Sequence, residues 1–272
     1  MDEIIYIDMS SKNTVKIIEE NFFKFSFLLG QCKKGVIYDG NDIKWSYSGL
    51  NVLARVICLN ISKEIVNNKI EEMIEKYKSL EVPFAWFIGP STQPKNLYEY
   101  LEKYKFINTG DWVGMYKELK DLEKKEYITN TIKIVEVDNA EQFNEWGKIV
   151  CAGFEIHDYF KEDTLSVFSD LGFGQGNSLR HYIAYYNGYP SSVCTLFLGM
   201  KGIAGIYFVA TRPEYRGKGI ATDLVNYVLN IAKNERLNTS VLQATDMGFS
   251  AYKKMGYKEL CRFNVYVWSP YQ

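Results

Sequence analysis

The residues whose types and spacing best suit chemistry lie in Arg216-Gly-Lys-Gly-Ile-Ala221, which follows a short apolar run. Gly217 and Gly219 carry no side chain, so a ligand can approach the backbone of this turn closely. Arg216 and Lys218 add two positive charges, which favour an anion. The segment therefore predicts a turn that binds phosphate or pyrophosphate.

A helix is predicted directly behind this turn, from Ile220 to Arg236. The first N–H groups of such a helix lack acceptors and carry the positive end of the helix dipole. They point into the glycine turn and would add to its affinity for a phosphate group. The apolar side chains recur every three to four residues, as one buried face requires, at Ile220, Leu224, Val228, Ile231 and Ala232.

Several kinds of nucleotide-binding loop contain a glycine turn, and their spacing distinguishes them. A Walker loop needs a glycine five residues before Gly217, where the chain has Arg212. A dinucleotide fingerprint needs Gly or Ala at the position of Thr222. The pattern that fits is Arg-x-x-Gly-x-Ala, which runs from Arg216 to Ala221. A loop that only joins a strand to a helix is the simpler alternative.

Composition limits the kind of protein and of partner. A chain of 272 residues, 47% of them hydrophobic, can bury one large or two modest cores. Its 32 basic and 33 acidic residues nearly balance, so we expect no nucleic-acid partner. We find no apolar run of the length a membrane span needs and no signal-peptide pattern, so we expect a cytoplasmic protein with no membrane partner. The five cysteines form no Cys-x-x-Cys pair, and we expect no metal. The oligomeric state stays open.

Hydrophobic periodicity predicts the same order of elements twice along the chain. A charged stretch at 117–126 separates the copies, and we place a linker at 120–130 between domains 1–119 and 131–272. The exposed end of a helix is the alternative for that stretch. The first half has predicted strands at 4–7, 52–59, 83–88 and 106–116, helices from about 13, at 63–79 and at 94–104, and a hairpin at 39–40. The second has strands at 132–137, 205–211 and 240–244, helices at 140–153 and 220–236, and a hairpin at 187–188.

Two anchors relate the halves in sequence. Tyr-Asp-Gly at 38–40 corresponds to Tyr-Asn-Gly at 186–188, an offset of 148, and Lys105-Phe106 corresponds to Gly256-Tyr257, an offset of 151. Subtracting 151 places the glycine turn within 65–70, which holds neither glycine nor arginine. We therefore predict that the first half kept the fold and lost the anion-binding turn.

A second signature lies downstream at 242–258, where a strand and turn precede a short helix with Tyr252 and a Gly-aromatic pair. The two signatures, in this order, resemble the acyl-CoA pyrophosphate loop and the following motif of the GNAT superfamily of N-acetyltransferases. The resemblance covers roughly 132–268. It implies an α/β fold of two tandem GNAT-like domains, each a mixed, mostly antiparallel twisted sheet flanked by helices, with the N-terminal domain degenerate.

The resemblance also implies acetyl-CoA as the acyl-donor cosubstrate. The strands at 205–211 and 240–244 would separate around pantetheine, with the thioester along Phe208 and Val209 and a main-chain N–H binding the oxyanion. Thr245 stands where many members have an Asn that bonds the cofactor. The implied cofactor contacts are Tyr207, Phe208, Val209, Arg216, Gly217, Lys218, Gly219, Ile220, Ala221, Thr245 and Tyr252.

Tyr252 matches the tyrosine that many members use as the general acid for the leaving thiolate. Because the chain has 21 tyrosines, a core role is the alternative. No general base is readable. His181 is interpreted as structural. The cluster Gly172–Gly176 is interpreted as a loop, with a flexible acceptor lid as the alternative. The loop that covers the acceptor site falls at 151–160, which makes four residues substrate-binding candidates: Phe154, Glu155, His157 and Tyr159.

The function implied is an N-acetyltransferase that moves the acetyl group of acetyl-CoA to a primary amine of a small molecule or peptide. A CoA-binding sensor or interaction module with weak catalysis is the alternative. That alternative is favoured by the missing turn of the first half and by the lack of a readable base. Release of thiol from acetyl-CoA distinguishes the two.

Overall fold

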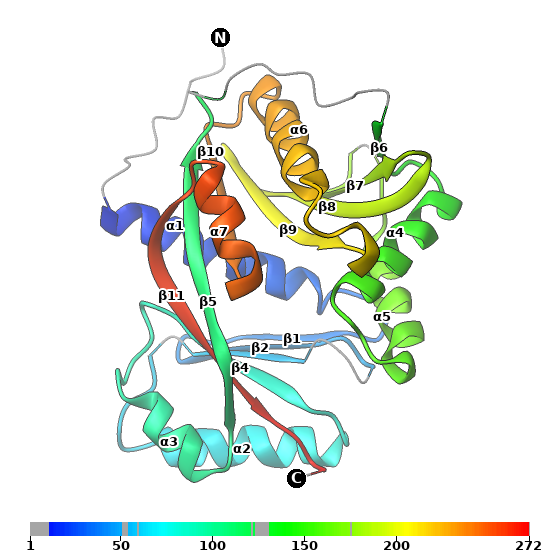
Figure 1. Ribbon diagram of the computed structural model, residues 1–272. Coiled ribbons are helices and arrows are strands. Elements are labelled where there is room, and N and C mark those ends of the chain that lie inside the picture. Colours follow the sequence, from blue (N-terminus) through cyan, green and yellow to red (C-terminus); the bar gives the residue numbers. More distant parts are fainter. Residues whose placement is uncertain are drawn as a thin grey trace.

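The computed structural model describes residues 11–50, 54–58, 60–120, 122, 131–174 and 176–271. The predicted strand at 4–7 and most of the predicted linker lie outside them. Within the described residues, one mixed sheet of 11 strands runs through both halves, with helices packed against it (Figure 1). The strand order is β1-β2-β3-β4-β11-β5-β10-β9-β8-β7-β6.

The order and type of the described elements agree with the prediction for both halves, except that α5 and β11 were not predicted. The first half contains α1 (Ser11–Leu28), β1 (Val36–Asp39), β2 (Ile43–Tyr47), β3 (Arg55–Cys58), α2 (Val66–Ser79), β4 (Phe84–Ile88), α3 (Leu97–Lys103) and β5 (Ile107–Glu118). The second contains β6 (Ile132–Glu136), α4 (Ala140–Gly153), α5 (Asp158–Leu171), β7 (Leu179–Tyr186), β8 (Tyr189–Met200), β9 (Ile203–Thr211), α6 (Ile220–Asn234), β10 (Thr239–Ala244), α7 (Asp246–Lys254) and β11 (Lys258–Trp268).

The last strand of each half lies in the other half's part of the sheet. β5 pairs antiparallel with β10 on one side and with β11 on the other, and β11 also pairs with β4. Figure 1 shows β5 and β11 running together through the middle of the molecule. Lys117, placed in the charged linker stretch by sequence, belongs to β5 and pairs with Ser240. The sheet therefore continues across the predicted domain boundary.

The pairing of β5 with β11 relates the two halves by a two-fold axis. Phe263 lies opposite Trp112, and these positions differ by the offset of 151 that the sequence anchors indicated. Shifting each residue by 151 converts the pair on one side of Phe263–Trp112 into the pair on its other side. This is expected when two copies of one unit face each other around such an axis. The three central pairs are Phe263 with Trp112, Arg262 with Val113, and Asn264 with Asp111.

The ends of α7 and α3 show the same offset. Gly256 and Lys105 both have positive φ, +87° and +64°, and their N–H groups bond back into the preceding helix. The next N–H reaches Tyr252 O in one half and Leu101 O in the other. The halves thus share the same helix cap.

The position predicted in the first half for the counterpart of the glycine turn was wrong. α6 begins at Ile220 and α2 at Val66, an offset of 154 at this point, because the halves differ in length between these elements. The residues that correspond to Arg216–Gly219 are therefore Ser62–Ile65, three positions before the predicted match. This tetrapeptide also contains neither glycine nor arginine.

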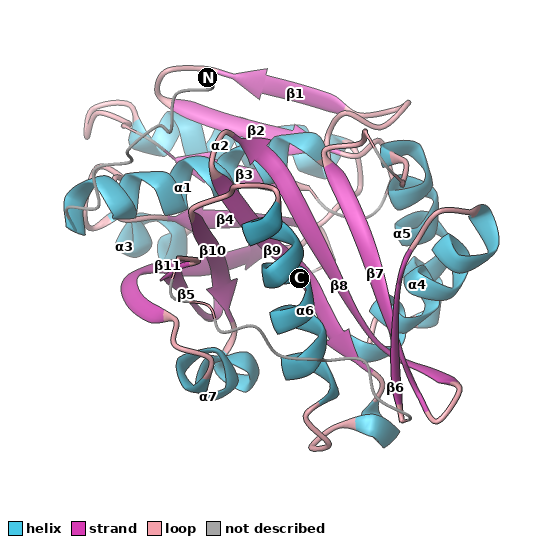
Figure 2. Cartoon of the chain, turned by 90° about the horizontal axis from the view of Figure 1, so that it is seen from above, coloured by secondary structure: helices cyan, strands magenta, loops and turns pink. Residues whose placement is uncertain are grey.

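The helices form two layers on the sheet. Alternate residues of a strand point to opposite faces, and in β9 Tyr207 packs in the core cluster of α1 and α4 whereas Ile206 packs against α6. Figure 2 shows α4 and α5 on one side of β7 and β8, and α6 on the other. A third cluster lies around α2. No described helix combines the length and apolarity needed to cross a membrane.

Candidate functional site

We call the place where β9 and β10 stop pairing with each other the candidate cleft. These parallel strands pair at three positions, and the last pair is Gly205 with Val241. Beyond it β9 continues to Thr211 and β10 to Ala244 without further pairing to each other. The geometry agrees with the divergence that the resemblance implied for these two strands.

A β-bulge interrupts β9 beside this cleft. Tyr207 pairs with Thr195 and Ala210 with Val193, so Phe208 and Val209 both lie opposite one residue of β8. Phe208 has φ of +46°, a conformation that an aromatic residue rarely adopts. The bulge takes the backbone at 208–209 out of register with β8, which suits predicted main-chain contacts to a thioester. The side chain of Phe208 packs on Phe168, with ring centroids 4.7 Å apart.

The glycine turn is shaped to leave its backbone open. Gly217 and Gly219 have φ of +77° and +78°, and no atom lies within 4 Å of the place a Cβ would occupy at either residue. Gly219 is the N-cap of α6 and no side chain caps it. The Asp223 N–H bonds to Gly219 O, while no described residue accepts from the N–H groups between them. The turn therefore presents unsatisfied donors and open space to an anion.

The two charged residues of the turn are held differently. Arg216 donates from Nη2 to Gly153 O at 2.8 Å and from Nη1 to Glu155 Oε1 at 3.0 Å. Its guanidinium thus reaches the end of α4 and anchors the turn there. The Lys218 ammonium lies 5.2 Å from the ring centroids of Tyr186 and Tyr215, where cation–π attraction holds it.

Tyr252 lies on α7, partly buried, with its ring perpendicular to that of Tyr257 at a centroid distance of 5.7 Å. Burial raises the pKa of the Tyr252 hydroxyl, so this group is neutral at physiological pH and can donate a proton. No described residue forms a hydrogen bond with that hydroxyl.

Thr245 is the exposed N-cap of α7 and makes no side-chain cap. Ile220 packs in the core, so only its backbone faces the turn.

Three of the acceptor-site candidates, Phe154, Glu155 and His157, lie on the connection between α4 and α5, and Tyr159 lies in the first turn of α5. Phe154 and Tyr159 are exposed, and Glu155 is engaged by Arg216. The His157 Nδ1 accepts from the Tyr159 N–H at 3.3 Å and caps α5. This cap gives His157 a structural role. The segment is therefore tied to the glycine turn through Glu155.

His181 fits its structural interpretation. Its side chain is buried, and Nδ1 lies 2.8 Å from Thr195 Oγ1. Burial against Trp146 and its neighbours lowers the pKa of His181 to about 4. The imidazole is consequently neutral at pH 7.

Sequence reasoning missed a contribution of the first half to the cleft. α1 crosses the face of β10 and β9, where the Tyr207 hydroxyl donates to Asn21 Oδ1 at 2.8 Å. Phe25 stacks on the Tyr207 ring with centroids 3.6 Å apart. A signal was present in the sequence, because the polar Asn21 and Ser26 interrupt the apolar face of the predicted helix.

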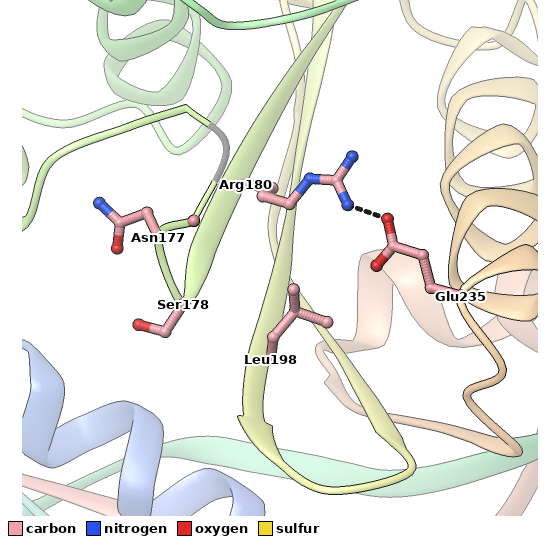
Figure 3. Close-up of a pocket in the computed structure, with 6 residues that line it drawn as sticks. Asn177, Ser178, Arg180, Leu198 and Glu235 are labelled. Carbon is pink, nitrogen blue, oxygen red and sulfur yellow. Dashed lines mark hydrogen bonds and ion pairs between the residues drawn. The ribbon is translucent and has the colours of Figure 1, made fainter. Parts of the chain in front are cut away.

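A separate pocket of about 640 Å³ lies at the other end of α6 (Figure 3). Arg180 crosses it and pairs with Glu136 and Glu235. Glu235 follows the last turn of α6, whereas the glycine turn precedes the first, so a helix about 22 Å long separates them. None of the predicted site residues lines this pocket. Among the described residues, no group of three His, Cys, Asp or Glu side chains could hold a metal ion.

Comparisons with known proteins give the family of part of the second half. Residues 143–257 match the acetyltransferase (GNAT) family. A GCN5-related N-acetyltransferase from Kribbella flavida is similar in structure, with a TM-score of 0.69, 13% identity and coverage of 91% of this chain and 94% of that one. A functionally unknown conserved protein from Staphylococcus epidermidis is similar with a TM-score of 0.66 and 15% identity, and the match covers 91% of this chain and 97% of that one. A tandem GNAT protein from the clavulanic acid biosynthesis pathway has a TM-score of 0.56 and 9% identity, and the match covers 93% of this chain and 95% of that one.

These structures are similar over nearly the whole chain, and at such low identity they show the fold. No curated protein matches the sequence significantly. The family match falls on the half that carries the cleft, the bulge and the glycine turn, so residues 143–257 form an acetyltransferase (GNAT) family domain.

Proposed function

We propose that residues 131–272 bind acetyl-CoA and transfer its acetyl group to a primary amine of a small molecule or peptide. The observation that carries the proposal is the glycine turn at the start of α6, whose donors are unsatisfied and whose surroundings are open. It lies at the C-terminal end of β9, the strand that bears the bulge. One ligand with a diphosphate and an acyl arm would suit both features.

Each part of the transfer has a candidate group in this chain. The N–H groups of the turn would bind the diphosphate, and β9 and β10 would align the acyl arm between them. When bound, acetyl-CoA supplies an activated acetyl group. As an amine attacks the carbonyl carbon, a main-chain N–H at Phe208 or Val209 would donate to the carbonyl oxygen. When the carbon–sulfur bond breaks, the Tyr252 hydroxyl would give its proton to the departing sulfur, and the proton that the amine loses as the amide forms would return to the Tyr252 oxygen through solvent.

We infer that the first half does not bind acetyl-CoA. The counterpart of the glycine turn, Ser62–Ile65, has no glycine at which a diphosphate could approach the backbone. Leu101, the counterpart of Tyr252, is fully buried and has no proton to give. These replacements support one acetyl-CoA site per chain.

The test is a titration of the purified chain with acetyl-CoA, followed by an assay of thiol release with a panel of amines and peptides. The proposal expects one site per chain and amine-dependent thiol release. Absence of binding would overturn it. Binding without thiol release from any amine would favour a CoA-binding sensor instead.

A further inference from the structure

Arg55, on β3 of the first half, is a buried cation without a counter-ion in the described part of the chain. Its side chain packs 5.6 Å from the Phe87 ring centroid and donates to Ser26 Oγ at 3.2 Å. The residue is only 9% exposed, and no described carboxylate pairs with it. Burial lowers the pKa of Arg55 to about 10, because the interior disfavours its charge. A buried charge of this kind is costly unless an anion accompanies it.

Two buried amides near Arg55 also lack partners. Asn21 is completely buried, and while Oδ1 accepts from Tyr207, no hydrogen-bond partner is found for Nδ2. The Gln243 amide acts on the pKa of the nearby Tyr207 hydroxyl, yet both of its polar atoms are buried and neither has a partner in hydrogen-bonding geometry. α1 connects these groups, because Arg55 donates to Ser26 whereas Tyr207 donates to Asn21 and stacks on Phe25. Asn21 Nδ2 and Gln243 Nε2 are therefore buried donors for which no acceptor is found among the described residues.

This Arg55 cluster, comprising Arg55, Asn21, Tyr207 and Gln243, lies where the two halves meet over the cleft. Tyr207 and Gln243 each lie two residues beyond the last β9–β10 pair, on the face that α1 covers. Tyr207 directly precedes the bulge at Phe208–Val209. A ligand held by the cluster would therefore lie beside the proposed position of the thioester.

We propose that the Arg55 cluster binds the carboxylate of the acetyl acceptor, so that the acceptor is a small amino acid or a related amine that carries a carboxylate. This inference rests on the proposed function and names the substrate class of that site. The planar guanidinium fork matches a carboxylate, and the two amide N–H groups add donors. One cation balances one negative charge, which favours a carboxylate over a phosphate dianion. The cover of α1 favours a small molecule over a peptide chain.

The test compares amino acids with their methyl esters as acceptors for the full chain. We expect the kcat/KM ratio of acid to ester to exceed one in the unmodified protein. Arg55→Met should lower that ratio about 10- to 100-fold, because a hydrogen-bonded charge partner is lost. Lys44→Met is the control, since Lys44 already has the Asp39 carboxylate as its partner. This control should leave the ratio unchanged.

Direct binding separates this inference from the proposed function. Calorimetry with amino acids alone needs no acetyl-CoA, and we expect binding that Arg55→Met abolishes. Thermal unfolding tests folding, and the variant should be at least as stable because a buried unpaired charge is removed. Acetylation of acids and esters with equal efficiency would overturn the carboxylate site and leave the acetyltransferase proposal standing. If amino acids bind but no acetyl group is transferred, the acetyltransferase proposal is overturned and the carboxylate site stands.

Discussion

Arg216 and Glu155 form an ion pair, with 3.0 Å between Nη1 and Oε1, that joins the glycine turn to the connection between α4 and α5. The residue expected to meet the cofactor phosphates is therefore shared with the segment expected near the acceptor. Glu155 itself has φ of +54°, so the ion pair accompanies an unusual backbone conformation. The pair makes the two ends of the site interdependent.

Glu155→Gln should tighten acetyl-CoA binding about two- to fivefold. The carboxylate is largely exposed, so the pair contributes at most about 1 kcal/mol, and its loss frees the Arg216 charge for the diphosphate. Calorimetry at low ionic strength measures the change. Asp158→Asn, which removes an exposed carboxylate paired with Lys161 at the start of α5, is the matched control. Weaker binding in Glu155→Gln would show instead that the ion pair holds the turn in its binding shape.

Gly219→Ala should weaken acetyl-CoA binding about tenfold and lower the free energy of unfolding by about 1 kcal/mol. Left-handed backbone costs an alanine this amount, and the new Cβ would fill the space left for the ligand. Gly110→Ala provides the comparison, since Gly110 also has positive φ and open surroundings. That variant should lose stability and keep its dissociation constant. If Gly219→Ala and Gly110→Ala bind acetyl-CoA with equal affinity, the turn is not part of the cofactor site.

Tyr252→Phe should reduce kcat about 100-fold and leave the acetyl-CoA dissociation constant unchanged. Because burial raises the pKa of this hydroxyl above the usual value near 10, its protonated form persists through neutral and mildly alkaline pH. Tyr252 should therefore cause no fall in kcat between pH 7 and 9. Steady-state rates across this range test both points. Unchanged kcat in the variant would assign Tyr252 to packing alone.

Acidification should destabilise the protein through His181. Its pKa is about 4 in the folded state and about 6.5 when unfolded, so the unfolded chain binds more protons between these values. The stabilisation present above pH 6.5 is lost as pH falls, by about 2 kcal/mol between pH 7 and 5. Urea unfolding at the two pH values measures the loss. His181→Gln should show a smaller difference, and an equal difference would exclude His181 as its source.

Residues 131–272 expressed alone should not fold into a stable unit, whereas coexpression with 1–130 should restore the protein. Without the first half, β10 and β11 lose β5, the strand that lies between them. Circular dichroism and cooperative unfolding report the outcome. A cooperative transition in isolated 131–272 would show that this half closes its own sheet.

Local patterns in the sequence were sufficient for much of the fold and of the candidate site. The bounds of α4 were predicted as Ala140–Gly153, as observed, and the glycine turn precedes a helix that begins at Ile220. Both depend on nearby residues alone. The offset of 151 was also readable, and the structure shows its physical meaning in the pair Phe263–Trp112.

Sequence patterns could not reveal which half supplies a given strand. The alternation of apolar and polar residues along β5 or β11 is the same whether the strand joins the sheet beside its own half or beside the other half. The exchange of these two strands was therefore not predicted. The contact between Asn21 and Tyr207 depends on that arrangement and was missed for the same reason. The counterpart of the turn was misplaced by three residues, because a fixed offset cannot follow a change in loop length.

The exchange of β5 and β11 also sets an order of events during biosynthesis. After β4 and β5 have left the ribosome, the place between them stays vacant until all elements up to α7 have been made and β11 arrives. Two strand edges of the nascent chain are exposed during that time, and such edges invite pairing with other chains. Closure then depends on contacts between residues far apart in sequence, which form slowly. Productive folding of this protein should therefore depend on translation speed and on chaperones that cover those edges.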